Sequence, residues 1–100
     1  MHARLSRFAG LDAERIDETL RQFQEDALSS LEAQPGFRGI TVCVNRGTGQ
    51  AVVLALWETV ADMHQSEDVA IRAREQAVAT AGPSREPIVD HYEVVLHRQV

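Results

Sequence analysis

Apolar and polar positions repeat along this chain with two different periods, one typical of strands and one of helices. Residues 2–8 alternate loosely and stop before Gly10, which predicts a first strand. Apolar side chains at steps of three or four over residues 13–33 predict one long amphipathic helix behind an Asp12 N-cap. This apolar stripe consists of Ile16, Leu20, Phe23, Ala27 and Leu31.

Two further strands are predicted around a hairpin. Pro35-Gly36 ends the helix, Phe37 begins the second strand, and the glycine-containing turn over residues 46–50 leads into a third strand at 51–57. Side chains alternate across a strand, so we expect one face to carry Ile40, Val42 and Val44 and the other to carry Phe37, Thr41 and Cys43. Cys43 is expected to be a small buried side chain.

The last third of the chain predicts a second helical region and a final strand. Thr59 and Asp62 resemble a capping box that opens a short helix over residues 60–64. Ser66 is the predicted N-cap of a longer helix that ends near Ala81, before Gly82-Pro83. The final strand is expected over residues 87–98. On the longer helix we expect a solvated charged face formed by Arg72 and Arg74 with Glu67, Asp68 and Glu75.

The predicted strands are apolar on both faces. Residues 51–57 form a continuous apolar run, and residues 88–89 and 94–96 also place large apolar groups next to each other. Successive side chains of a strand point to opposite faces, so such runs need cover on both sides. Two helices cover one face of a small sheet, and we therefore expect the other face to meet a second copy of the chain.

The element order is that of an α+β, ferredoxin-like βαββαβ fold. Right-handed crossovers place both main helices on one face of a four-stranded antiparallel sheet. No linker, repeat or low-complexity segment is visible, so we expect residues 1–100 to form a single domain.

Composition excludes several classes of function. The hydrophobic share of 44% is ordinary for a globular protein, and no run approaches the roughly 20 apolar residues of a membrane helix. A net charge of −5 with scattered arginines disfavours nucleic-acid binding. The N-terminus lacks the apolar core of a secretory signal, and a single cysteine permits no internal disulfide, so we expect a cytoplasmic protein.

Five segments, taken in order, carry a family resemblance: residues 2–8, 31–39, 45–50, 54–59 and the stretch Tyr92-Glu93-Val94. Together they resemble the antibiotic biosynthesis monooxygenase (ABM) family of the dimeric α/β-barrel superfamily. The resemblance implies a homodimer whose two sheets face each other as a barrel, with a pocket between sheet and helices in each subunit.

Members of this family differ in chemistry. Some oxidise polyketide-type aromatic phenols with molecular oxygen and without a metal or flavin, and others bind and degrade haem. The haem-degrading branch uses a tryptophan early in the second helical region and a histidine further along it. Here residues 63–74 contain no tryptophan, and His64 comes early, so haem degradation is not expected and we expect no cofactor.

Candidate site residues are few. Trp57, Phe23 and Met63 are candidates for contact with an apolar substrate, although its place at a strand end favours a role for Trp57 in packing the seam between helix and sheet. Tyr92 and His64 are candidate catalytic groups for hydrogen bonding and proton transfer.

Arg4 is the third catalytic candidate. Arg4 and Arg7 lie on opposite faces of the first strand, so one of them points inward and then requires an anionic partner. No metal site is expected, because His91 and His97 are about 20 Å apart on the predicted final strand and His64 has no ligand partner one turn away.

Two functions of different classes remain open. The first is a homodimeric, cofactor-independent monooxygenase that acts on a small aromatic compound of the polyketide or quinol type. The alternative is a non-catalytic dimer that binds a small apolar ligand or acts as a structural partner. The sequence contains no convincing acid–base pair, which favours the alternative.

Overall fold

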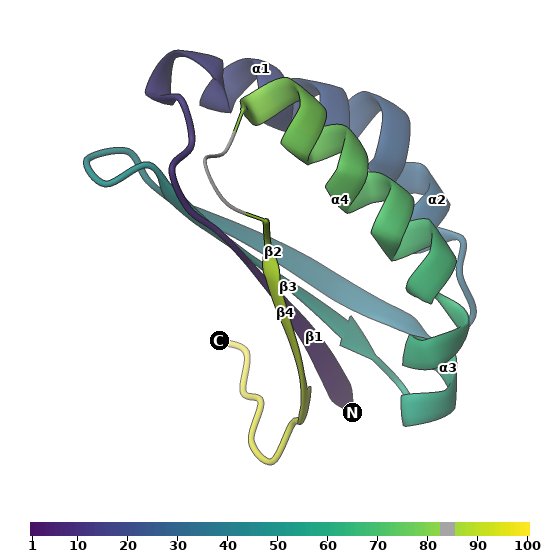
Figure 1. The fold of residues 1–100 in the computed structure, drawn as a ribbon. Coiled ribbons are helices and arrows are strands. Elements are labelled where there is room, and N and C mark those ends of the chain that lie inside the picture. The colour runs from purple at the N-terminus through teal and green to yellow at the C-terminus, as the bar shows by residue number, and fades with distance from the viewer. Residues whose placement is uncertain (83–85) are drawn as a thin grey trace.

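The computed structural model describes residues 1–82 and 86–100, and its helices all lie on one face of a four-stranded antiparallel sheet (Figure 1). The strands are β1 (His2–Phe8), β2 (Phe37–Asn45), β3 (Gln50–Trp57) and β4 (Ile88–Glu93). The helical elements are η1 (Ala13–Arg15), α1 (Ile16–Gln22), η2 (Phe23–Ala27), α2 (Leu28–Glu32), α3 (Val60–Gln65) and α4 (Glu67–Ala81). The strand order β2-β3-β1-β4 is the predicted ferredoxin-like α+β topology.

Several predicted helix ends are confirmed. The Asp12 side chain accepts a hydrogen bond from the Glu14 amide, and the Thr59 hydroxyl accepts one from the Asp62 amide, each at 3.0 Å. Gly82 ends α4 in the left-handed conformation at φ 62°. Ser66 occupies the N-cap position of α4 but makes no capping bond: its backbone is helical, and its hydroxyl accepts from Arg4 and donates to the Met63 carbonyl.

The long helix expected over residues 13–33 is not regular. It begins with a 3₁₀ turn, and a π-helical segment, η2, separates α1 from α2. In a regular α-helix Leu31 would be rotated by about 60° from Ile16. The wider π turn offsets much of this rotation, so that Ile16, Ala27 and Leu31 are all buried on the side facing the sheet.

The predicted face assignment of Phe37 is wrong. A register shift between Phe37 and Gly39 interrupts the pairing of β2 with β3. Phe37 therefore lies on the same side as Ile40, against the core formed by Leu31, Ala55, Trp57, Met63 and Ala70. Its ring meets the Trp57 ring edge to face, with centroids 5.4 Å apart.

The sheet face opposite the helices, here called the open face, is not covered by any helix of the described residues (Figure 1). The paired residues Leu5 and Leu54 lie at its centre, flanked by Val52 and Leu56. Cys43 belongs to this face and is exposed, so its predicted burial is wrong for a single subunit.

The final strand is shorter than expected and ends at Glu93 rather than near Arg98. Its last paired position joins Glu93 to His2, the first residue of β1, and one further bond runs from the Val94 amide to the Met1 carbonyl at 2.9 Å. Val95 and Leu96 are 86% and 81% exposed in the segment that follows. His97 consequently does not share a strand face with His91.

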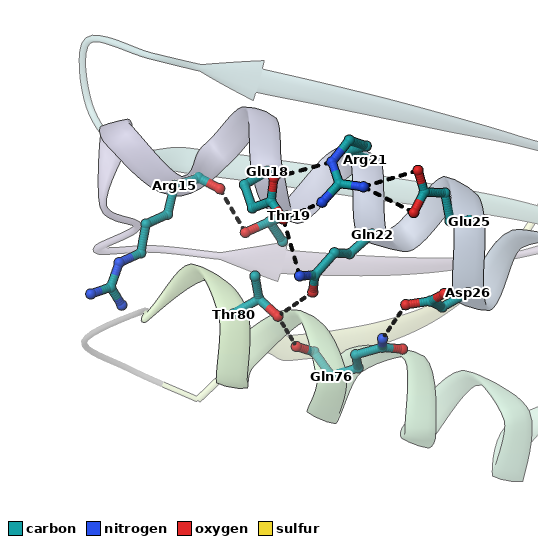
Figure 2. Close-up of polar contacts among 9 residues, drawn as sticks. All are labelled: Arg15, Glu18, Thr19, Arg21, Gln22, Glu25, Asp26, Gln76 and Thr80. Carbon is teal, nitrogen blue, oxygen red and sulfur yellow. Dashed lines mark hydrogen bonds and ion pairs between the residues drawn. The ribbon is translucent and has the colours of Figure 1, made fainter.

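Polar side chains clamp α4 to the first helical region along their shared seam (Figure 2). The Gln76 amide donates to Asp26 at 3.1 Å, and the Thr80 hydroxyl donates to the Gln22 amide oxygen at 2.9 Å. These two bonds, one turn apart on α4, set the distance between the helices above the sheet. Within residues 1–82 and 86–100, no helix combines the length and apolarity needed to cross a bilayer.

Gly36→Ala tests the turn that joins α2 to β2. Gly36 has φ +77°, and a Cβ atom there would overlap the Asp62 carboxylate. We expect a loss of about 2 kcal/mol in the free energy of unfolding, measured in urea. Gly47→Ala is the matched control, because its Cβ would make only ordinary contact with Asn45, and a change within about 0.5 kcal/mol is expected. Equal losses in both variants would contradict this account.

Candidate functional site

A largely apolar cavity of about 110 Å³ lies between the sheet and the helices. Strands β1, β2 and β3 form its floor, and α1, η2 and α4 form its roof. The space exists because five of its lining side chains are short: Ala51, Ala55, Ala70, Ala73 and Ala77. Its polar lining residues are Arg4, Ser6, Thr19 and Arg74. The cavity therefore has an apolar body with few polar contact points, as small-molecule sites commonly do.

Arg4 is the buried charge of this site. It is 3% exposed and points to the helix side of the sheet, whereas Arg7 is exposed on the other side, as the strand alternation predicts. Arg4 Nη2 donates to the Met63 carbonyl at 2.6 Å and to the Ser66 hydroxyl at 2.9 Å. These bonds hold the C-terminal turn of α3 against β1.

Glu67 is the anionic partner that the sequence required for a buried arginine. Its Oε2 atom accepts from Arg4 Nη2 at 2.8 Å, and its Oε1 atom accepts from Arg74 Nη2 at 3.2 Å. Burial alone would raise the pKa of Glu67, but the charges of Arg4 and Arg74 outweigh burial and lower this pKa. Burial lowers the pKa of Arg4, and the charge of Arg74 acts in the same direction, against the attraction of Glu67.

Arg74 was expected on a solvated face, and this expectation is wrong. Its side chain is 16% exposed, lines the cavity and binds Glu67. The sequence spacing could have indicated that Arg74 faces inward. Arg74 follows Glu67 by two helical turns and lies between Ala70 and Ala77 on the same side of α4. The long basic side chain interrupts a stripe of small residues, which marks it as inward-facing.

The structure brings only some of the predicted site residues to the cavity. Arg4 and Phe23 line it. Trp57 and Met63 are fully buried in the core cluster next to it, and Arg4 lies 5.7 Å from the centre of the Trp57 ring. Tyr92 pairs with Ala3 on the open face, away from the cavity.

His64 lies outside the cavity, near a residue that the sequence did not pair with it. Its ring centre is 6.1 Å from that of His91 on β4, whose Nε2 atom is 3.7 Å from Glu67. In the described part of the chain, no group of three or more His, Cys, Asp or Glu side chains has an arrangement suited to a metal ion.

The ion pairs of Glu67 predict an acid-sensitive contribution to stability. Because folding lowers the pKa of Glu67 below its ordinary 4.5, its contribution is complete above that value and is lost as the pH falls through the folded-state pKa. The stability advantage of the wild type over Glu67→Gln is therefore expected to be constant near neutral pH and to shrink below about pH 4.5. Urea unfolding over a pH series measures it, and parallel curves for the two proteins would contradict the assignment.

Comparison with known proteins identifies a matching family and distant relatives. The family model for antibiotic biosynthesis monooxygenases (ABM) matches residues 1–76. Two curated relatives, the uncharacterized proteins MT2634 and Rv2557 from two strains of Mycobacterium tuberculosis, are each 25% identical over 87 residues. The alignment covers 86% of this chain but 38% of each relative, so the chain spans well under half of their length.

Three solved structures share the fold. The monooxygenase of ActVA-Orf6 from Streptomyces coelicolor, in complex with nanaomycin D, aligns with a TM-score of 0.78 at 14% identity over 99% of this chain and 91% of its own. SnoaB, a cofactor-independent oxygenase from Streptomyces nogalater, gives 0.70 at 18% identity over 96% and 94%. The heme-degrader MhuD from Mycobacterium tuberculosis, with two hemes bound, gives 0.69 at 21% identity over 97% and 99%.

These structural likenesses show the common fold, and the family model shows the lineage. Because that model matches 76 of the 100 residues, this chain belongs to the antibiotic biosynthesis monooxygenase family.

Proposed function

We propose that this protein is a single-domain homodimer that binds a small, largely apolar ring compound in the cavity of each subunit. We further propose that it is a monooxygenase that oxygenates an electron-rich aromatic compound of this kind, such as a phenol or quinol, without a bound cofactor. The observation that carries the proposal is the apolar cavity with the buried cation Arg4 in its wall.

The size of the cavity supports a substrate with a single ring. An engineered protein cavity of about 150 Å³ accommodates benzene. A cavity of about 110 Å³ is smaller, so a bound ring would extend toward the side that is partly open to solvent. A haem, with its four pyrrole rings, does not fit this space, and no step through haem is part of the proposal.

The charge of Arg4 supports chemistry that passes through an anion. A phenol or enol reacts with oxygen after losing its proton: the anion transfers an electron to oxygen, and the two radicals form the C–O bond of a peroxide anion. This anion takes back the proton to become a hydroperoxide on a carbon that carries hydrogen. Loss of water from the hydroperoxide then leaves a carbonyl group. In this scheme the protein binds the ring and stabilises its anion in a site of low dielectric, which is Arg4's proposed role.

The other candidates take secondary roles in this proposal. Phe23 contacts the apolar body of the substrate, and Trp57 and Met63 support the wall that positions Arg4. His64, whose ring lies near that of His91, is the proposed proton carrier, and His91 in turn approaches Glu67. Tyr92, on the open face, is proposed to face the partner subunit.

The open face and the segment after β4 support the homodimer. Val52, Leu54 and Leu56 remain half-buried on a face without a covering helix, while Val95 and Leu96 project into solvent. Burying such surfaces against a second copy gains about 25 cal/mol per Å² of apolar area. The resulting assembly is the two-sheet barrel that the family resemblance implies.

One observation favours the alternative function, a non-catalytic ligand-binding dimer. The cavity lining contains arginines, Ser6 and Thr19 but no histidine, carboxylate or tyrosine from the described residues. Proton transfer within the cavity therefore has no obvious base, and binding without turnover is the second candidate function.

Ala73→Leu tests the cavity as the functional site. Three additional carbon atoms on α4 would fill much of the space, so we expect at least a tenfold loss in binding of small phenols and in any oxygen consumption with them. Ala79→Leu adds the same atoms on the exposed side of α4 and serves as the control. Oxygen-electrode and calorimetric measurements separate the two functions: binding without turnover supports the alternative, and equal behaviour of both variants argues against the cavity.

Leu54→Glu tests the dimer. A carboxylate at the centre of the open face would be buried without a partner in the two-sheet barrel, so we expect the variant to be monomeric where the wild type is dimeric. Gln24→Glu, on the exposed side of η2, is the control for added charge. Analytical ultracentrifugation over a dilution series measures both, and a stable, folded wild-type monomer at micromolar concentration would contradict the proposal.

A further inference from the structure

One end of the cavity carries more positive than negative charge. Arg4 and Arg74 both line the cavity, and both bind the single carboxylate of Glu67. Arg4 is 3% and Arg74 16% exposed, whereas Glu67 is 33% exposed. The cluster therefore has an excess of one positive charge in a mostly apolar surrounding, where an uncompensated charge is costly.

The hydrogen bonds of Arg4 leave part of its guanidinium without an acceptor. All three of its hydrogen bonds use Nη2, which donates to Met63, Ser66 and Glu67. Its Nε atom is buried and has no partner among the described residues. An unpaired buried donor is rare in folded proteins and indicates that an acceptor belongs there.

A second unpaired donor belongs to the tryptophan ring that the Arg4 guanidinium faces. The Nε1 atom of Trp57 is also buried without a partner in the described chain, and the Arg4 guanidinium lies 5.7 Å from the centre of that tryptophan ring. The Arg4 and Trp57 side chains thus place two unpaired N–H donors beside the oxygen atoms that Arg4 Nη2 already binds.

We propose that the cavity selects a small organic anion, with a single-ring apolar body and one negatively charged oxygen group held between Arg4 and Arg74. This inference rests on the proposed ligand-binding cavity and adds the charge of its ligand. The apolar wall accepts the ring, the excess charge is neutralised by one carboxylate or phenolate, and Glu67 disfavours a ligand with a second negative charge. Arginine is suited to this task, because its planar fork binds oxyanions directly.

Calorimetric titration with matched probes tests the charge of the ligand. Benzoate and pentafluorophenolate are the two anionic probes, and benzamide and pentafluorobenzene are their neutral counterparts at neutral pH. We expect each anion to bind at least tenfold more tightly than its neutral counterpart. The better of the two anions identifies the oxyanion that the site accepts. Quenching of Trp57, the only tryptophan in the chain, provides a second readout next to Arg4.

Two substitutions locate the binding to the charged cluster. Arg74→Gln is expected to reduce anion binding to the level of the neutral probes, whereas Arg72→Gln, at an exposed position of the same helix, leaves it unchanged. Glu67→Gln removes the competing negative charge and is expected to tighten anion binding by about tenfold. Arg74 is chosen over Arg4 because Arg4 also holds α3 in place.

The outcomes distinguish this inference from the proposed function. Equal affinity for anions and neutral probes, or unchanged binding in Arg74→Gln, overturns anion selection while the cavity remains a ligand site. Weaker anion binding in folded Glu67→Gln also overturns it. If none of the four probes binds, both the inference and the proposed ligand-binding cavity fail.

Discussion

The buried guanidinium of Arg4 connects the three parts of the structure that matter for function. From the central strand β1 it bonds to the last turn of α3, to Ser66 between the two helices and to Glu67 in the first turn of α4. Burying a cation is costly, and here three acceptors and the nearby Trp57 ring offset the cost. The same side chain thereby fixes the α3–α4 corner and presents positive charge to the cavity.

The cavity itself results from small side chains that lie beneath two hydrogen-bonded helical regions. Alanines on β3 and α4 leave space that larger residues would fill, since protein interiors are otherwise packed almost without voids. The bonds from Gln76 to Asp26 and from Thr80 to Gln22 hold α4 above this space from its outer side (Figure 2). The helix therefore stays in place although it contributes few large apolar groups to the core.

Together these features distinguish the two faces of the sheet. The helix side encloses a cavity with a charged end, and the open face presents leucines and valines of the central strands. The chain shares its fold with proteins of different chemistry. Function therefore follows from the cavity and its charges rather than from the topology.

The sequence by itself determined the element order, the sheet topology, the placement of Arg4 and Arg7 on opposite faces and the need of the inward one for an anion, because strand alternation and helix periodicity are local properties. It missed the π segment, the bulge that turns Phe37 inward and the end of β4, since these depend on how strands pair and how far a neighbour extends. Only the tertiary structure identified Glu67 as the partner and placed Arg74 at the cavity. Contacts between residues more than sixty positions apart, such as Arg4 and Glu67, are decided by packing across the whole fold and leave no local pattern to read.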